Sequence, residues 1–352
     1  MTALPSQYNE MTDEQVLAAI VRAKATLGDE LTILGHHYQR DEVVQFADAR
    51  GDSLGLSQQA ARTTARYIVF CGVYFMAETA AILCQPDQIV MQPAIEAMCP
   101  MAAMANDREA SKAWSALSAV WGDDLIPITY QNSVAELKAF VGRNGGAVCT
   151  SSNADALFRW AFAQKRHILF MPDRWLGTNT ALAMGIPPRE IGLWDRDSTD
   201  AADLAHCRLV VWPGFCYVHS RFSVEDVKAA RARYPGALII VHPESDAAVV
   251  ARSDATGSTT GIIDYVERAP AGATIVVGTE WHLVHRLGRQ FTDRRVVPLR
   301  RSSCRTMEMT TIRHLLYVLD GILAGEPRNI ISVDGDIATW ARVALDRMLR
   351  LS

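Results

Sequence analysis

Three cysteines occupy the same place in three similar segments of the chain, and they carry the clearest chemical content of the sequence. Cys99, Cys216 and Cys304 each close a segment that opens with an apolar run and a polar turn. Ser53 and Cys99 are 46 residues apart, and so are Ser258 and Cys304. Thiolates at one repeated position predict a metal site that the three segments share.

The cysteine pattern predicts an iron–sulfur cluster rather than a structural zinc ion. Structural zinc takes four ligands, often from CxxC pairs, and this sequence has none. A 4Fe-4S cluster normally takes four cysteines, so three leave one iron open to a substrate. An open iron acts as a Lewis acid, which favours dehydration or condensation over electron transfer. We also expect a helix amino terminus after each of the three cysteines, where a thiolate is stabilised. The other cysteines are interpreted as ordinary core thiols: Cys71, Cys84, Cys149 and Cys207.

Polar side chains follow the first apolar run of each segment. These are His36, His37 and Tyr38, then Tyr130, Gln131 and Asn132, then His242, Pro243 and Glu244. A carboxylate in a partly dry cavity has a raised pKa and can act as a base near neutral pH, so we expect this of Glu244. An exposed surface glutamate is the alternative. His36 and His37 could equally be a solvated pair at a strand end.

A second polar turn in each segment precedes a helix. Ser53, Ser151 and Thr259 lie where these helices are expected to begin. Their hydroxyls could simply cap the helices. The unpaired backbone N–H groups of a helix amino terminus also bind anions, and both roles can coexist.

The apolar runs predict the elements that position these residues. Runs rich in Val, Ile and Phe, each followed by helical periodicity, are typical of parallel strands covered on both faces. They are Tyr67–Cys71, His167–Met171, Leu238–Val241 and Thr274–Val277. We therefore expect an α/β fold of three similar α/β/α units, each with a small parallel sheet of roughly four strands, arranged around a pseudo-threefold axis. Their polar turns would face one central cavity.

The repeat also predicts domain boundaries. The expected divisions are 1–115 for the first unit with an N-terminal helix, 116–205 for the second, 206–290 for the third, and 291–352 for the final strand, the third cysteine and C-terminal helices. We expect helices over 307–326 and near 336–351 to cover an outer face. Residues 187–207 are interpreted as an elaborated loop.

Bulk properties exclude several classes of protein. A net charge of −4 and a pI near 6.1 give no basic surface for nucleic acid and no polybasic membrane signal. No uninterrupted apolar run reaches membrane-spanning length, and the amino terminus lacks the features of a secretory signal. An odd number of cysteines, 7, does not fit a disulfide framework. We expect a soluble, cytoplasmic protein.

Many strings of the sequence resemble the quinolinate synthase family of bacterial NAD biosynthesis. They are GHHYQ, GDSLGLSQQA, FCGVYFMAETAAIL, EAMCPMA, TYQNSVAELKA, CTSSNA, LFMPDRWLGTN, WPGFCYVH, VHPE, GSTTGII and VGTEWHLVHRL, in order from about residue 31 to about residue 315. The resemblance implies α/β/α units around one oxygen-sensitive 4Fe-4S cluster. It implies condensation of iminosuccinate with dihydroxyacetone phosphate to quinolinate, phosphate and two waters. It further implies a functional link to an iminosuccinate-producing aspartate oxidase or dehydrogenase.

The resemblance also assigns roles to individual residues. The cluster ligands it implies are Cys99, Cys216 and Cys304. It implies Glu244 as general base, with Tyr38 and Tyr130 assisting proton transfer. The substrate contacts it implies are His36, Ser53, Tyr130, Asn132, Ser151, His219, His242, Glu244 and Thr259.

Three positions depart from the family pattern. Ser245 stands where the family often has a cysteine, and Tyr74 stands where a histidine is expected. The third cysteine motif reads Cys304, Arg305, Thr306, Met307 instead of cysteine, any residue, Asn, Met, which makes Cys304 the least secure ligand.

Three other functions remain open on the sequence. A dehydratase of another hydroxy acid could use the same open iron without needing the phosphate-binding hydroxyls. A non-catalytic iron–sulfur sensor would need a surface recognition element such as a basic helix-turn-helix, and none is evident in the sequence. A metabolite-binding protein without a metal is the third.

Overall fold

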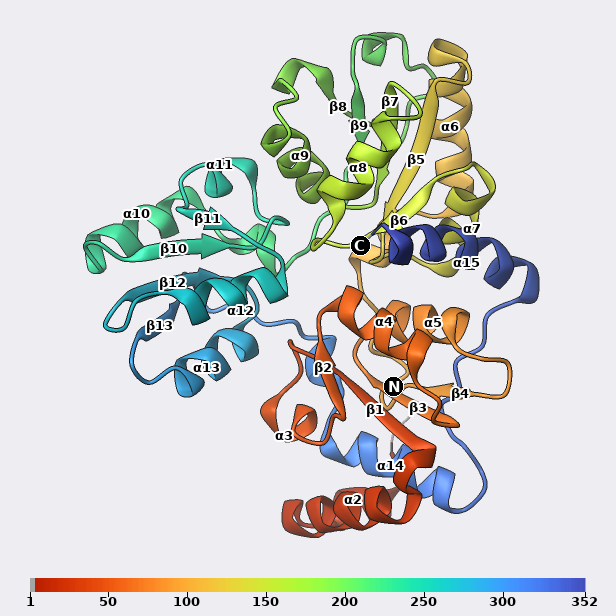
Figure 1. The fold of residues 1–352 in the computed structure, drawn as a ribbon, viewed down its shortest axis with the longest axis vertical. Coiled ribbons are helices and arrows are strands. Elements are labelled where there is room, and N and C mark those ends of the chain that lie inside the picture. The colour runs from red at the N-terminus through yellow and green to blue at the C-terminus, as the bar shows by residue number, and fades with distance from the viewer. Residues whose placement is uncertain (1–3, 352) are drawn as a thin grey trace. The chain divides into compact units, whose positions relative to one another are not determined.

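The computed structural model describes residues 4–351, and the chain divides into two compact units. Unit 1 comprises Met1–Cys99 and Ser303–Asp334, and unit 2 comprises Pro100–Ser302 and Gly335–Ser352. The described residues form three all-parallel sheets flanked by helices, one in unit 1 and two in unit 2 (Figure 1). This confirms the predicted α/β class and its three similar α/β/α units. The pseudo-threefold arrangement and the boundaries near 115, 205 and 290 stay predictions.

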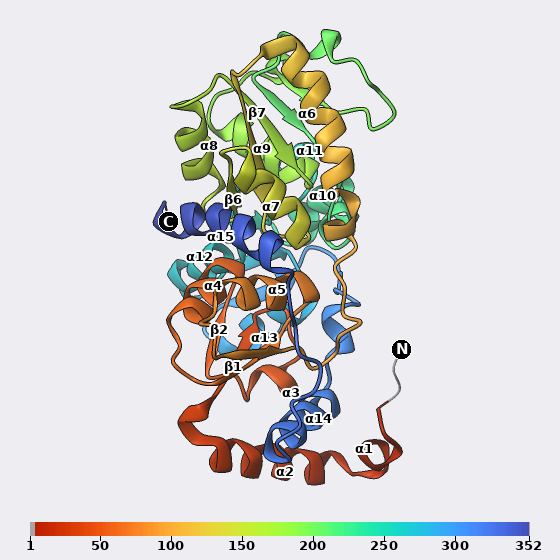
Figure 2. The same cartoon turned by 90° about the vertical axis from the view of Figure 1, so that its right-hand side faces the viewer.

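Unit 1 contains a four-stranded sheet of order β2-β1-β3-β4. Its strands are β1 (Leu31–His36), β2 (Ala49–Gly51), β3 (Tyr67–Cys71) and β4 (Ile89–Met91). Its helices are α1 (Ser6–Glu10), α2 (Asp13–Leu27), η1 (Gly28–Glu30), α3 (Asp41–Val44), α4 (Ser53–Arg62), α5 (Tyr74–Leu83), η6 (Met307–Met309) and α14 (Ile312–Leu323). Helices α2 and α14 lie side by side against one face of the sheet (Figure 2).

The first sheet of unit 2 has five strands in the order β6-β5-β7-β9-β8. They are β5 (Leu125–Tyr130), β6 (Ala147–Cys149), β7 (His167–Met171), β8 (Ile191–Leu193) and β9 (Leu209–Val211). The helices around it are η2 (Met101–Met104), α6 (Asp107–Trp121), α7 (Ala135–Arg143), α8 (Ala154–Phe162), α9 (Arg174–Ala183), η3 (Pro188–Glu190), η4 (Ala202–Leu204) and α15 (Gly335–Arg350). The predicted loop over residues 187–207 thus contains β8, which adds a fifth strand beside β9.

The second sheet of unit 2 has the order β11-β10-β12-β13. Its strands are β10 (Leu238–Val241), β11 (Ala255–Thr256), β12 (Thr274–Gly278) and β13 (Arg295–Pro298). The remaining helices are η5 (His219–Arg221), α10 (Val224–Arg233), α11 (Ala247–Val250), α12 (Thr259–Arg268) and α13 (Trp281–Gln290). All four predicted strand runs are strands, because β-branched residues buried on both faces suit a covered parallel sheet.

Close contacts explain where the last helix of the chain lies. Helix α15 packs on α7 and on β6, as the predicted covering helix should. A Cβ atom at Gly142 of α7 would lie 2.0 Å from the Trp340 carbonyl oxygen, so only glycine allows this approach. No helix among residues 4–351 combines the length and apolar character needed to span a bilayer.

One expectation about the cysteines is wrong. The helices that follow Cys99, Cys216 and Cys304 are the short 3₁₀ segments η2, η5 and η6, not α-helices. A 3₁₀ segment of three or four residues aligns few peptide dipoles, so it provides little of the helix-terminus stabilisation expected for a thiolate.

Candidate functional site

A buried carboxylate lies at the end of β10 in unit 2. Glu244 is 2% exposed and follows His242 and Pro243 in the turn after the strand. Its Oε2 atom lies 2.6 Å from Nδ1 of His219, which comes from η5. Nε2 of His219 lies 3.1 Å from the Thr279 hydroxyl, and its ring stacks on His242 with 4.3 Å between centroids. The imidazole therefore connects the carboxylate to the end of the neighbouring strand β12.

Tyr130 connects this carboxylate to the other sheet of unit 2. Tyr130 is the last residue of β5, and its buried hydroxyl hydrogen-bonds with Glu244 and with Ser151. Burial raises the pKa of Tyr130 well above its ordinary value, and the charge of Glu244 raises it further. The phenol is therefore neutral and can donate a proton to an acceptor.

Glu244 itself is ionised across the neutral range. Burial alone would raise its pKa, but the imidazoles of His242 and His219 and the hydrogen bonds of His219 and Tyr130 outweigh this and lower the pKa to about 2. The expectation of a raised pKa is thus wrong, because the imidazoles of His242 and His219 and the Tyr130 hydroxyl surround the carboxylate. The alternative of an exposed surface glutamate is also excluded.

A second buried carboxylate, Asp173, lies just after β7 and caps α9. It is fully buried and accepts a hydrogen bond from the Leu176 N–H at 2.5 Å. Burial raises its pKa well above the ordinary value, and the charge of Glu244 raises it further. Backbone N–H groups of Leu176, Trp175 and Cys216 act in the opposite direction. The pKa values of these two neighbouring buried carboxyl groups are thus shifted in opposite directions.

The cysteines differ in burial. Cys99, Cys216 and Cys304 are half-buried, as is Cys84, and none of them forms a disulfide. Burial raises the pKa of the Cys71 thiol to about 12 and raises that of Cys149, so these two are neutral core thiols. The three predicted ligands therefore have the accessible thiols that a cluster requires, and the donor set fits. In unit 2, ligand atoms of Cys216, His219 and Glu244 all lie within 4.8 Å of one another.

In unit 1, the corresponding turn carries His36 and Tyr38 after β1. The rings of these two residues meet edge to face with 4.7 Å between centroids. The Tyr38 N–H donates to Nδ1 of His36 at 3.1 Å. His36 is buried and Tyr38 is half-buried, so His36 is not part of a solvated pair.

The hydroxyls predicted at helix starts are not the caps of those helices. Ser53 and Thr259 are the first residues of α4 and α12, whereas the capping acceptors are Asp52 and Ser258. Ser151 lies three residues before α8 and bonds to Tyr130 instead. Capping therefore does not account for the three hydroxyls.

Asn132, two residues after the end of β5, has a polar side-chain atom without a hydrogen-bond partner within residues 4–351. Its buried amide oxygen has no hydrogen-bond partner among the described residues. A buried acceptor without a partner costs free energy, so it marks a place where a ligand donor would fit.

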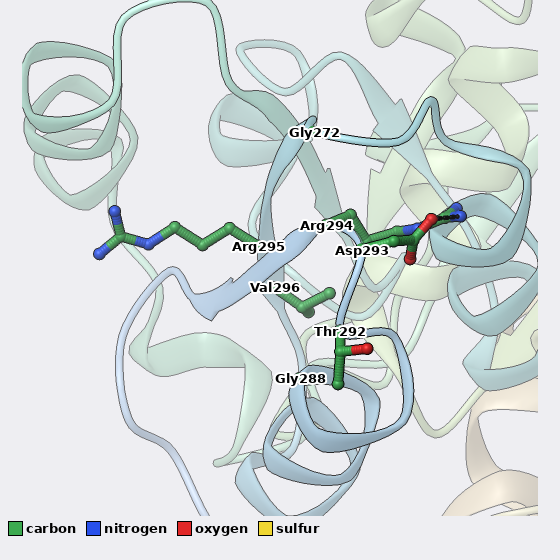
Figure 3. A pocket seen from close by; sticks show the side chains of 7 residues that line it. All are labelled: Gly272, Gly288, Thr292, Asp293, Arg294, Arg295 and Val296. Carbon is green, nitrogen blue, oxygen red and sulfur yellow. Dashed lines mark hydrogen bonds and ion pairs between the residues drawn. The ribbon is translucent and has the colours of Figure 1, made fainter.

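A separate cavity lies where β12 and β13 begin, at the edge of the sheet opposite to the turn that carries Glu244. It offers no comparable chemistry. It is lined by Gly272, Gly288, Thr292, Asp293, Arg294, Arg295 and Val296 (Figure 3). Arg294 pairs with Asp293 and donates to the carbonyls of Val266, Glu267 and Ala269. Arg295 extends away from that pair (Figure 3). Arg294 therefore holds the end of α12, and the two arginines do not converge on a ligand.

The sequence reasoning missed Asp173 and Thr279 and left Asn179 without a role. Asp173 and Thr279 follow the third strands of their sheets, β7 and β12. The polar residues after first strands were examined as candidates, and the same signal after third strands would have found both. Asn179 gave no such signal, because its partners are backbone carbonyls distant in the sequence.

The fold and the site together define an α/β protein with a buried cluster of ionisable side chains at the strand ends of unit 2. The sequence matches the family model described as quinolinate synthetase A protein over residues 18–350. A quinolinate synthase of Bacillus licheniformis is 46% identical over 354 residues, covering 99% of this chain and 96% of the relative. One of Bacillus cereus is 47% identical over the same length and coverage. The chain belongs to the quinolinate synthetase A family, which confirms the predicted family and the enzyme class.

Proposed function

We propose that this enzyme acts in NAD biosynthesis and condenses iminosuccinate with dihydroxyacetone phosphate to form quinolinate, phosphate and water. Relatives that carry the name quinolinate synthase align over 99% of the chain, which supports this activity. We place the reaction in the cytoplasm, supplied by an aspartate oxidase or dehydrogenase because iminosuccinate is an oxidised aspartate.

The hydrogen-bonded chain from Ser151 through Tyr130 and Glu244 to His219 is the observation that carries the proposal. Isomerisation and dehydration need a group that takes a proton from carbon and a group that gives one to a departing hydroxyl. Glu244 is an ionised acceptor and Tyr130 is a neutral donor in direct contact with it. His219 stabilises the ionised Glu244, and Ser151 stabilises the phenolate that Tyr130 leaves after donation. Tyr38 is proposed to assist the same transfers from unit 1.

Both proposed substrates are anions, and the net negative chain must bind them through local donors. We assign the phosphate and carboxylate contacts to residues at helix starts and strand ends, where backbone N–H groups and hydroxyls are available. They are His36, Ser53, Asn132, Ser151, His219, His242 and Thr259. The freedom of Ser53 and Thr259 from capping supports this assignment for the two hydroxyls.

The cluster ligands are proposed to be Cys99, Cys216 and Cys304, as the family resemblance implies. When bound, the cluster would supply a Lewis acid at its iron without a protein ligand. Glu244 and His219 lie next to Cys216, so proton transfer would take place near that metal. Thr306, which departs from the family pattern, has its hydroxyl 3.3 Å from the Cys304 sulfur.

An anaerobic assay tests the proposal. Quinolinate formed from iminosuccinate and dihydroxyacetone phosphate is measured while iron and sulfide are counted on the same sample. Cys99→Ala, Cys216→Ala and Cys304→Ala should each lose the cluster and the product. Cys84→Ala is the matched control, because Cys84 is also half-buried and outside any disulfide but does not belong to the set. Full activity in any of the three variants contradicts the ligand set, and turnover without dihydroxyacetone phosphate contradicts the reaction.

A further inference from the structure

The side chain of Asn179 holds the turn that carries Glu244. Its Nδ2 atom donates to the carbonyl oxygens of Pro243 and Ser245, both at 2.8 Å. These are the two residues on either side of Glu244, and Asn179 is 7% exposed. One buried amide nitrogen thus fixes the backbone on both sides of the carboxylate.

The chemistry of this contact calls for an amide. Ser245 is fully buried, and a buried carbonyl without a partner is costly. An Asn amide has two N–H donors on one nitrogen, which matches two acceptors in one place. The neighbouring Gly177 allows the close approach, because a Cβ there would lie 2.5 Å from the Phe170 ring of β7. Gly177 therefore lets α9 pack closely on its own sheet, and this packing fixes the helix that carries Asn179.

Helix α9 is itself fixed at its start. Asp173 caps it through Leu176, and the Arg174 N–H donates to the Gly214 carbonyl at 2.8 Å. Gly214 is two residues before Cys216, and a Cβ there would lie 2.3 Å from the Pro172 carbonyl oxygen. The helix thus connects the loop that leads to Cys216 with the turn that carries Glu244.

We propose that Asn179 is a positioning residue for Glu244 in the condensation. By tying the carbonyls of Pro243 and Ser245 to α9, it keeps the Glu244 carboxylate in line with Tyr130 and His219. This role rests on the proposed function, since it acts only through the base assigned there. The distance of 2.6 Å between Glu244 and His219 leaves little room for movement of the turn. A misplacement of about 1 Å in a reacting group can cost roughly a hundredfold in rate.

The test compares single and double variants of the cluster-loaded enzyme prepared without air. Asn179→Ala removes both donors, and Asn179→Ser retains one hydroxyl donor at a shorter reach. Asn144→Ala is the matched control, because Asn144 also donates from Nδ2 to a backbone carbonyl at 2.8 Å but lies at the end of α7. For each variant kcat, KM, iron per chain and the thermal midpoint are measured, and Asn179→Ala is combined with Glu244→Gln.

The expected result is a fall in kcat of about tenfold to a hundredfold in Asn179→Ala, with iron per chain unchanged. Asn179→Ser should fall between this variant and the parent, and Asn144→Ala should keep its kcat. The double variant should be no slower than Glu244→Gln alone, because Asn179 acts only through that carboxylate. If Asn179→Ala does not fold, the serine variant provides the same comparison.

Two results would overturn the inference. The first is a normal kcat in the Asn179 variants beside a slow Glu244→Gln, which removes the positioning role and leaves the proposed base intact. The second is an additive loss in the double variant, which shows that Asn179 acts by another route. Full turnover in Glu244→Gln instead contradicts the assignment of Glu244 as the base, and the positioning role with it, whereas absence of quinolinate formation in the parent enzyme contradicts the proposed function.

Discussion

The turns after strands β1 and β10 share a hydrogen-bond frame but differ in the residue that the frame presents. In the first, Nδ1 of His36 accepts from the Tyr38 N–H at 3.1 Å, and in the second, Nδ1 of His242 accepts from the Glu244 N–H at 3.3 Å. Tyr38 is half-buried, whereas Glu244 is buried and bonded to His219. The repeat therefore supplies one geometry, and the side chain two residues after the histidine sets the chemistry.

The shared frame extends to the second strand of each sheet. Asp48 accepts from the Ile33 N–H at 2.8 Å, and Asp254 accepts from the Ile239 N–H at 2.7 Å. Each aspartate also pairs with a basic residue, Lys24 in unit 1 and Arg231 in unit 2. Identical backbone contacts in two sheets mean that substitutions at equivalent slots can be compared directly.

The largest effect should come from removing the charge at the second turn. Glu244→Gln keeps the size of the side chain but removes the proton acceptor, so kcat should fall by about 10²–10⁴ with iron per chain unchanged. Steady-state assays under nitrogen with iron analysis measure both. A normal kcat would mean that the two turns do not differ in the way proposed and that another group is the base.

The two tyrosines sharpen the comparison between units. Tyr130→Phe removes a hydrogen-bond donor from Glu244 and a partner from Ser151. It should therefore lower kcat about a hundredfold and lower the free energy of unfolding by about 1–3 kcal/mol. Tyr38→Phe should lower kcat without a comparable loss of stability, because Tyr38 is half-buried. Turnover and urea unfolding separate these effects. Equal losses of stability in both variants would contradict the claim that Tyr130, unlike Tyr38, belongs to a buried hydrogen-bond network.

Stability should depend on acid pH through Glu244. Its pKa is lowered from 4.5 to about 2 in the folded protein, so the carboxylate stabilises the fold above pH 4.5 and loses this contribution as the pH falls toward 2. Urea unfolding of the metal-free protein between these pH values should show a smaller decline in Glu244→Gln. Glu225→Gln, an exposed change on α10, should decline as the parent does. Parallel curves for Glu244→Gln and the parent would contradict the low pKa.

The smallest effects are expected at the second polar turn of each segment, where variants can distinguish helix capping from substrate binding. Asp52→Ala and Ser258→Ala remove the caps of α4 and α12, so each should lower the free energy of unfolding by about 1 kcal/mol. Ser53→Ala should leave stability nearly unchanged and raise KM for dihydroxyacetone phosphate. Thermal unfolding and kinetics distinguish the two. A stability loss in Ser53→Ala equal to that in Asp52→Ala would return Ser53 to a structural role.

The strands and the polar residues at their ends were predictable because both follow local rules. Runs such as His167–Met171 are buried on both faces, and polar residues such as Tyr130 and Glu244 lie at or just after the ends of strands. The charge of Glu244 was not predictable, since His219 approaches it from a different element. Strand β8 was also missed, because its three residues have no periodicity long enough to detect.

A crystal structure of the protein grown without air and soaked with quinolinate tests the central claim most directly. The account predicts one cluster held by the sulfurs of Cys99, Cys216 and Cys304, with the product in contact with Glu244 and Tyr130. A fourth side chain on the cluster, or a product bound away from Glu244, would contradict it.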